Sequence, residues 1–134
     1  DLQPLAALVE LRELWASDNL FGDLAPLAKL TKLVSLDLDG NFSAGKIKDL
    51  APLAGLINLE MLNISNHPKI PDLAPLAGCV SLKTLKANVL KPKIAGWPAL
   101  LGLKRLETIH THSEIMTKAD QATFKKRKVD VSLD

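Results

Sequence analysis

The hydrophobic positions of this chain repeat in blocks. In residues 23–41 (DLAPLAKLTKLVSLDLDGN), leucines are first spaced three apart and then alternate with polar residues. Near-copies of this block begin at residues 1, 49 and 72, and a weaker copy begins at residue 96. Successive starts are separated by 22 to 26 residues. A period of this length predicts a solenoid in which each repeat is one small structural unit.

The second half of each repeat is predicted to be a strand. In the second copy, Leu36 and Leu38 alternate with Ser35, Asp37 and Asp39. This period of two indicates a strand with one buried face. We therefore expect the leucines to point into the core and the three polar side chains to face solvent.

The first half of each repeat is predicted to be a short helical segment. In the second copy, Leu27, Leu30 and Leu33 are spaced three apart. Asp23 is the expected N-cap of this segment. Pro26 falls in the first turn, where the missing amide hydrogen has no intrahelical partner to lose.

The repeats are expected to stack, because one repeat cannot bury its own leucines. Five copies over residues 1–112 then form a parallel sheet on one side and short helices on the other. The repeat pattern ends after residue 112. In residues 113–134 the sequence predicts a helix that begins near Thr117 or Asp120, followed by a strand at 129–133.

The repeat DLAPLAxLxxLxxLxLxxN resembles that of bacterial internalin-type and eukaryotic protein-phosphatase-regulator-type leucine-rich repeat proteins. The resemblance implies an α/β leucine-rich repeat solenoid, right-handed, with a parallel concave sheet and short convex helices. Residues 113–134 resemble the helix–strand half-repeat that closes bacterial members. An internalin-type protein would act at a cell surface and a phosphatase-regulator-type protein inside the cell, and the residues leave this choice open.

An asparagine usually follows the strand in such repeats and bonds the backbone of the turn. Asn19 and Asn41 occupy this position, whereas His67 and Leu90 replace it in the third and fourth copies. The second copy also carries an extension at residues 42–45. This extension is either a tolerated surface loop or part of a binding ridge beside the sheet.

The outward positions of the strands are expected to form three columns across the sheet. The first column contains Glu13, Ser35, Met61, Thr84 and Thr108. The second contains Trp15, Asp37, Asn63, Lys86 and His110. The third contains Ser17, Asp39, Ser65, Asn88 and His112. A polar strip of mixed charge is typical of a surface that recognises another protein.

We therefore predict a non-catalytic module that binds a protein or peptide through the concave strand face and its flanking loops. The predicted partner-binding residues are Trp15, Asp37, Asp39, Met61, Asn63, Lys86, Asn88, His110 and His112. Trp15 is either a binding anchor or a residue that packs on an adjoining repeat. The alternative function is a structural segment of a larger or self-associating protein with exposed ends.

Little in the sequence indicates reaction chemistry. His110 and His112 point to the same side of one strand, but their neighbours Lys86 and Asn88 are poor ligands for a metal. No acid is placed to orient a histidine base. We predict no catalytic residues, no metal and no cofactor. Cys79 takes the place of a core leucine and is interpreted as a small buried hydrophobe.

Composition and charge limit the partners further. Hydrophobic residues make up 47% of the chain and aromatic residues only 4%, which fits a leucine-filled core. The net charge is −4 over residues 1–81 and +6 over residues 82–134. The basic run at 125–128 has no aromatic stacking platform beside it, so binding to nucleic acid is not expected. No apolar run approaches the length of a membrane span.

Overall fold

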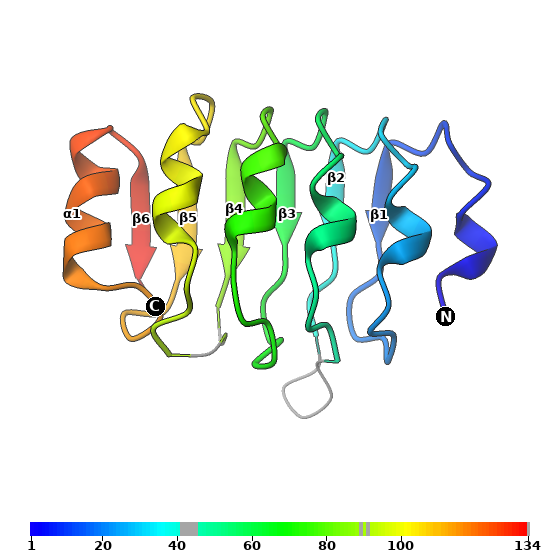
Figure 1. The fold of residues 1–134 in the computed structure, drawn as a ribbon, viewed down its shortest axis with the longest axis horizontal. Coiled ribbons are helices and arrows are strands. Elements are labelled where there is room, and N and C mark those ends of the chain that lie inside the picture. Colours follow the sequence, from blue (N-terminus) through cyan, green and yellow to red (C-terminus); the bar gives the residue numbers. More distant parts are fainter. Residues whose placement is uncertain (41–45, 89, 91, 134) are drawn as a thin grey trace.

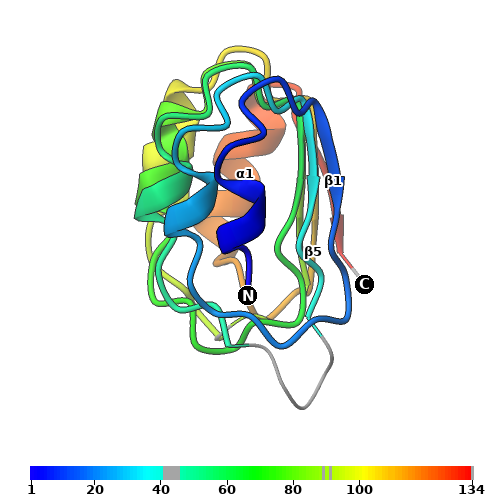
Figure 2. The same ribbon diagram turned by 90° about the vertical axis from the view of Figure 1, so that its right-hand side faces the viewer.

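The structure, a computed structural model, describes residues 1–40, 46–88, 90 and 92–133. These residues form two layers, with a six-stranded parallel sheet on one side and short helices on the other (Figures 1 and 2). The strands lie side by side in chain order, from β1 to β6. This arrangement confirms the predicted α/β solenoid, in which each repeat contacts its sequence neighbours.

The strands are short because the alternating pattern lasts for only a few residues in each repeat. They are β1 (Glu13–Trp15), β2 (Ser35–Asp37), β3 (Met61–Asn63), β4 (Thr84–Ala87), β5 (Thr108–Thr111) and β6 (Asp130–Leu133). Their central hydrophobic residues pair across the sheet, as Leu14 does with Leu36 and Leu36 with Leu62. The predicted final strand is therefore present and joins the same sheet as the repeats.

The convex segments are 3-10 helices rather than α-helices. They are η1 (Gln3–Leu5), η2 (Ala25–Leu27), η3 (Ala51–Leu53), η4 (Ala74–Gly78) and η5 (Trp97–Gly102). Each carries its proline at the first or second helical position, as expected. This conformation suits segments of three to six residues, because 3-10 helices are rarely stable in longer runs.

The predicted capping role of Asp23 needs a correction. The N-cap residue of η2 is Leu24, which offers no side-chain cap. Asp23 instead precedes the cap, and its Oδ1 accepts a hydrogen bond from the Ala25 N–H at 2.9 Å. An aspartate that bonds the backbone two residues ahead forms a local turn of its own. The carboxylate still satisfies a free amide at the start of the helix, but from one position earlier.

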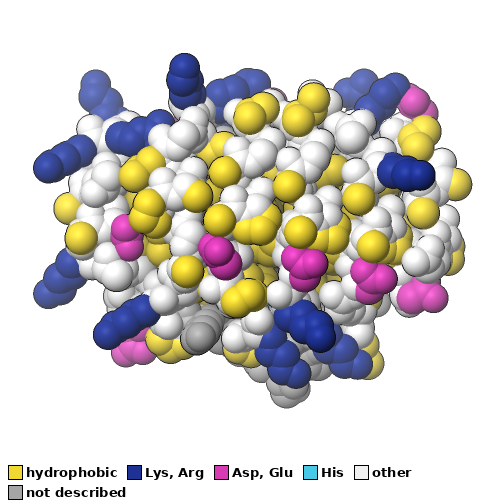
Figure 3. All heavy atoms as spheres, viewed as in Figure 1, with side chains coloured by type: hydrophobic (Ala, Val, Ile, Leu, Met, Phe, Trp, Pro, Cys, Tyr) yellow, Lys and Arg dark blue, Asp and Glu magenta, His cyan; other side chains and the backbone are white. Residues whose placement is uncertain are grey.

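The same turn is repeated along the helix layer. The equivalent carboxylates accept from the amides of Gln3 at 2.8 Å, Ala51 at 2.8 Å and Ala74 at 2.8 Å. A row of acidic side chains crosses this side of the molecule (Figure 3). In the fifth repeat Ala95, which pairs with Asp72, takes this place, and the N-cap is Gly96 with a φ of +93°. A Cβ on Gly96 would collide with the Asp72 carboxylate and the Ala74 amide, so the close packing of these two coils requires glycine.

The core is a set of leucine columns that run the length of the solenoid. In the second repeat Leu27, Leu30, Leu33, Leu36 and Leu38 are all fully buried. Burying one such side chain contributes roughly 1.5–3 kcal/mol. Because each leucine packs between the repeats on either side, most of this stabilisation comes from contacts between repeats.

The C-terminal end of the core is covered. Thr117 is the N-cap of α1 (Lys118–Lys126), and its hydroxyl accepts a hydrogen bond from the Asp120 N–H at 3.1 Å. Phe124 of α1 is buried and packs edge-on against Trp97, with the ring centroids 6.3 Å apart. Val129 and Val131 are also buried, whereas Leu133 is not. Phe124, Val129 and Val131 thus extend the core beyond the last repeat.

The first repeat is more exposed than the others. Leu8 is 47% exposed, although its counterparts Leu30 and Leu56 are fully buried. Leu5, Leu11 and Leu14 are only partly buried. The same sequence position therefore has a different environment at the end of the stack and in its middle.

This difference predicts unequal effects of one substitution at equivalent positions. Leu56→Ala is expected to lower the free energy of unfolding by about 2–5 kcal/mol, because it leaves a cavity between repeats. Leu8→Ala is expected to cost about 1 kcal/mol, since half of the side chain already faces solvent. Urea denaturation of both variants measures the difference. Equal losses would mean that Leu8 is as well covered as Leu56.

Candidate binding face of the sheet

The outward side chains of the strands lie in the predicted columns. Glu13, Ser35, Met61, Thr84 and Thr108 are paired in register from β1 to β5. So are Trp15, Asp37, Asn63, Lys86 and His110. We call this surface, with the residues that follow each strand, the sheet face. β6 adds Asp130 and Ser132, which the sequence analysis did not place in the columns although their alternation with Val131 marks them.

Asp37 is the centre of a hydrogen-bond network on the sheet face. Its Oδ1 accepts from the Ser17 hydroxyl at 2.6 Å and from the Asp39 N–H at 3.0 Å. Its Oδ2 accepts from the Asn63 Nδ2 at 3.1 Å. Burial alone would raise the pKa of this carboxyl, but these hydrogen bonds and the Lys86 charge hold the pKa below its usual value. Asp37 therefore joins three neighbouring repeats as a carboxylate.

The network continues along the turns that follow β2 and β3. Asp39 accepts a hydrogen bond from the Asn66 Nδ2 at 2.7 Å. Asn63 accepts one from the Ser65 N–H at 3.1 Å through its Oδ1. Asn63 and Ser65 are only 6% and 4% exposed, although alternation places them on the solvent side. The middle of the sheet face is thus a polar layer whose members bond one another, and two of them are almost fully buried.

His67 is a buried residue of the same region. In the sequence it stood out only because it replaces the asparagine of the repeat pattern. It is 1% exposed, and its Nε2 donates a hydrogen bond to the Leu38 carbonyl oxygen at 2.6 Å. In the first repeat, Asn19 bonds the backbone of its own turn, because its Nδ2 donates hydrogen bonds to the Ala16 and Ser17 carbonyl oxygens, both at 3.1 Å. The longer imidazole reaches the backbone of the preceding repeat instead.

The two ends of the sheet face carry its exposed groups. Trp15 of β1 is 64% exposed, which confirms its outward position. At the other end Lys86 and His112 are exposed, and His110 is half-buried. The Glu114 N–H lies 3.4 Å from the His112 Nδ1. The neutral imidazole then carries its proton on Nε2, where it can be donated to a ligand.

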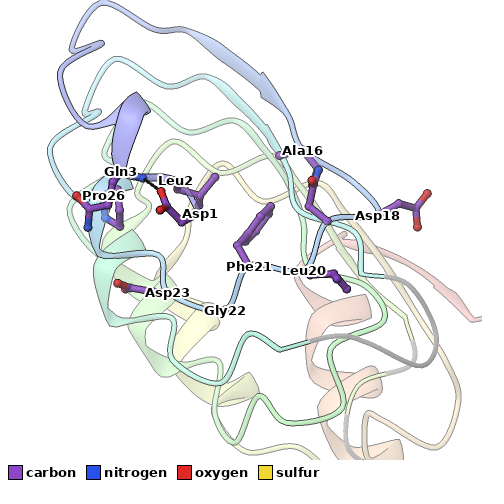
Figure 4. A pocket seen from close by; sticks show the side chains of 11 residues that line it. Asp1, Leu2, Gln3, Ala16, Asp18, Leu20, Phe21, Gly22, Asp23 and Pro26 are labelled. Carbon is purple, nitrogen blue, oxygen red and sulfur yellow. Dashed lines mark hydrogen bonds between the residues drawn. The ribbon is translucent and has the colours of Figure 1, made fainter.

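Other candidate features lie outside this face. A hollow of about 530 Å³ opens at the end of the first repeat, where Phe21 projects between the first helix and the first strand (Figure 4). Its lining includes Leu2, Ala16, Leu20 and Pro26 but no column residue from the second repeat onward. The predicted extension at 42–45 and parts of the loop 89–93 fall outside the described residues.

The described residues contain no cluster of three or more side chains that could hold a metal ion. Cys79 is buried in the core, where its Sγ lies 3.3 Å from the Leu53 carbonyl oxygen. Burial raises the pKa of this thiol to about 11, so it stays protonated. None of the helices in the described part of the chain is long and apolar enough to cross a membrane.

Solved structures with the same architecture include two internalins and a further leucine-rich repeat protein, all from bacteria. Internalin C2 of Listeria monocytogenes superposes on the whole chain with a TM-score of 0.83 and 31% sequence identity. The chain spans 56% of the length of that structure. A second internalin of the same species superposes on 98% of the chain with a TM-score of 0.59 and 20% sequence identity. The chain covers 42% of the length of that structure.

A leucine-rich repeat protein of Leptospira interrogans matches 96% of the chain, with 38% of its own length covered, at a TM-score of 0.63 and 17% identity. Because their sequence identities are only 20% and 17%, the second internalin and the Leptospira protein show a shared fold and nothing more. No family model and no curated protein matches the sequence.

The burial of His67 predicts a pH-dependent stability. Burial lowers the pKa of His67, while the hydrogen bond to Leu38 and the Asp39 charge partly oppose this shift. The unfolded chain therefore binds a proton more readily than the folded one. The free energy of unfolding should fall as the pH is lowered below about 6.5, the ordinary pKa of histidine.

The variant His67→Asn restores the residue that Asn19 represents in the first repeat and removes the titrating group. Urea denaturation between pH 5 and 8 should show a smaller loss of stability on acidification for this variant than for the wild-type protein. The absolute stability of the variant can differ without affecting this comparison. The same pH dependence in both proteins would contradict the assignment to His67.

Proposed function

Since this chain belongs to the leucine-rich repeat proteins and shares the internalin fold over its whole length, we propose that it is a non-catalytic module that binds a protein partner through the sheet face. The partner-binding residues in this proposal are Trp15, Asp37, Asp39, Met61, Asn63, Lys86, Asn88, His110 and His112. The observation that carries it is Trp15, a large aromatic side chain 64% exposed on an otherwise polar surface. Aromatic anchors of this kind supply much of the binding energy in protein interfaces.

The remaining residues divide into two groups by their contacts. Asp37, Asp39 and Asn63 are engaged with one another and with neighbouring turns. In the proposed complex they hold the surface in one shape, which lowers the entropy lost on binding. Met61 is half-buried beside them, and it supplies a second apolar contact. Lys86, Asn88, His110 and His112 set the orientation of the partner.

A face of this kind suits a macromolecule. It is built from outward side chains of five neighbouring parallel strands, so it offers a broad surface. A small ligand is normally bound in a concave and mostly apolar pocket. A protein partner can instead cover several strands and all three columns at once.

A second candidate function is structural, and the exposure of the first repeat favours it. Val9 and Leu20 of the first repeat are exposed, as Leu8 is, and a further repeat or a second copy could cover them. In this role the first repeat would pack against another chain and Trp15 would lie at that contact. Its signature in sedimentation velocity is an average mass that rises with protein concentration, while a module that acts through the sheet face stays monomeric.

The proposal predicts that Trp15→Ala weakens partner binding by about tenfold or more while the fold is kept, because the exposed indole adds little to stability. A partner is captured from cell extracts with the wild-type domain, and its affinity for each purified variant is then measured. Ile57→Ala is the matched control, since Ile57 is 52% exposed but lies between η3 and β3, away from the sheet face. Equal affinities for the two variants would move the binding site off the sheet face.

A further inference from the structure

We propose that the end of the sheet face formed by Lys86, His110 and His112 binds an acidic, extended segment of the partner. This inference deepens the proposed function and rests on it. It commits to one ligand chemistry, namely carboxylates presented by a strand-like peptide. Three observations carry it: which charges of the face are already engaged, how the three side chains are spaced, and what surrounds them.

The carboxylates in the middle of the face are engaged within the chain. Asp37 accepts hydrogen bonds from Ser17, Asp39 and Asn63, and Asp39 accepts one from Asn66. A cationic partner would have to compete with these bonds. In the proposed complex these carboxylates therefore keep the face in one shape, and the cationic end supplies the charged contacts with the partner.

The cationic end is available. Lys86 is exposed, and within the described part of the chain its ammonium forms no ion pair. Its charge helps to lower the pKa of Asp37, which lies two strands away on β2. His112 is also exposed and can donate through Nε2, because its Nδ1 faces the Glu114 N–H. Both groups can bind a carboxylate without breaking a contact within the chain.

The spacing of these groups matches an extended peptide. Lys86 and His110 are direct neighbours in the register of β4 and β5, so their backbones are about 4.8 Å apart. His112 is the first residue after β5 and follows His110 by two residues, so an extended backbone would put it on the same side about 7 Å further along. Alternate side chains of an extended peptide point to one side at that same interval. Carboxylates at alternate positions of a ligand could then reach His110 and His112 together, with Lys86 beside them.

The surroundings allow this interaction. Asp130 of β6 pairs with Thr108, two residues before His110, and Glu114 follows His112 by two residues. Neither carboxylate forms an ion pair with a histidine among the described residues. The whole segment 82–134 carries a net charge of +6, which attracts an acidic chain to this end.

The same features disfavour a nucleic acid as the ligand. Binding to single strands combines a charged groove with aromatic side chains on which bases stack. The aromatic residues of this end, Trp97 and Phe124, are both buried. Trp15 is exposed but belongs to β1, at the opposite edge of the sheet. One lysine and two histidines without a stacking platform fit carboxylates better.

The test uses a fluorescein-labelled peptide of alternating Glu and Thr, titrated at low salt and followed by fluorescence anisotropy. We expect Lys86→Gln to weaken binding by about two- to fivefold, the range of an exposed charge pair. The double variant Lys86→Gln/His110→Gln should weaken it by about tenfold. Lys125→Gln removes the same charge from the exposed basic run at the end of α1 and is the matched control. Its affinity should stay close to that of the wild-type protein.

Four results would overturn the inference, and the first three are comparisons. One is a loss of affinity for Lys125→Gln as large as that for Lys86→Gln. Another is binding of a peptide of alternating Gln and Thr as tight as that of the acidic peptide. The third is tighter binding of a thymidine oligonucleotide that depends on Lys86 in the same way. Absence of binding by the acidic peptide would also overturn it. The proposed function would then still depend on the Trp15→Ala comparison, so the two failures can be told apart.

Discussion

The structure depends on one constraint, which is that no repeat can bury its own leucines. Leu30 and Leu56 are covered only because another coil packs on each side of them, whereas Leu8 at the open end of the stack is half exposed. The constraint fixes the parallel sheet, since successive strands must lie side by side in the same direction. The outward side chains of the strands are not needed for the packing of the core, so this side can carry a binding surface.

The polar residues at the strand ends add a second layer of contacts between repeats. Asp37 and Asn63 bond across neighbouring strands, and His67 reaches the Leu38 carbonyl of the repeat before it. These bonds set the relative positions of three repeats on the side where the proposed partner would bind. The face is therefore rigid in its middle, while the groups that could contact a partner lie toward its two edges.

The sequence allowed the fold and the columns of the face to be predicted, because each copy alternates inward and outward residues as the second copy does around Leu36 and Leu38. The environment of those polar residues could not be predicted in the same way. Alternation assigns Asn63 and Ser65 to the solvent side, but both are almost fully buried and bond residues of the adjacent repeats. Likewise, the pattern placed Asp23 at the start of a helix without showing that it bonds Ala25 from one position before the cap. Such details depend on the neighbouring coil rather than on the local sequence.

The central claim is that a protein partner contacts the sheet face and not the helix layer. Site-specific photo-crosslinking tests it directly, with a crosslinking amino acid placed either at Thr84 or at Ala77. Both positions belong to the fourth repeat, but Thr84 is half-buried on β4 and Ala77 is exposed on η4. The account predicts a covalent adduct with the partner from Thr84 and none from Ala77. An adduct from Ala77 alone would place the partner on the helix layer and contradict the account.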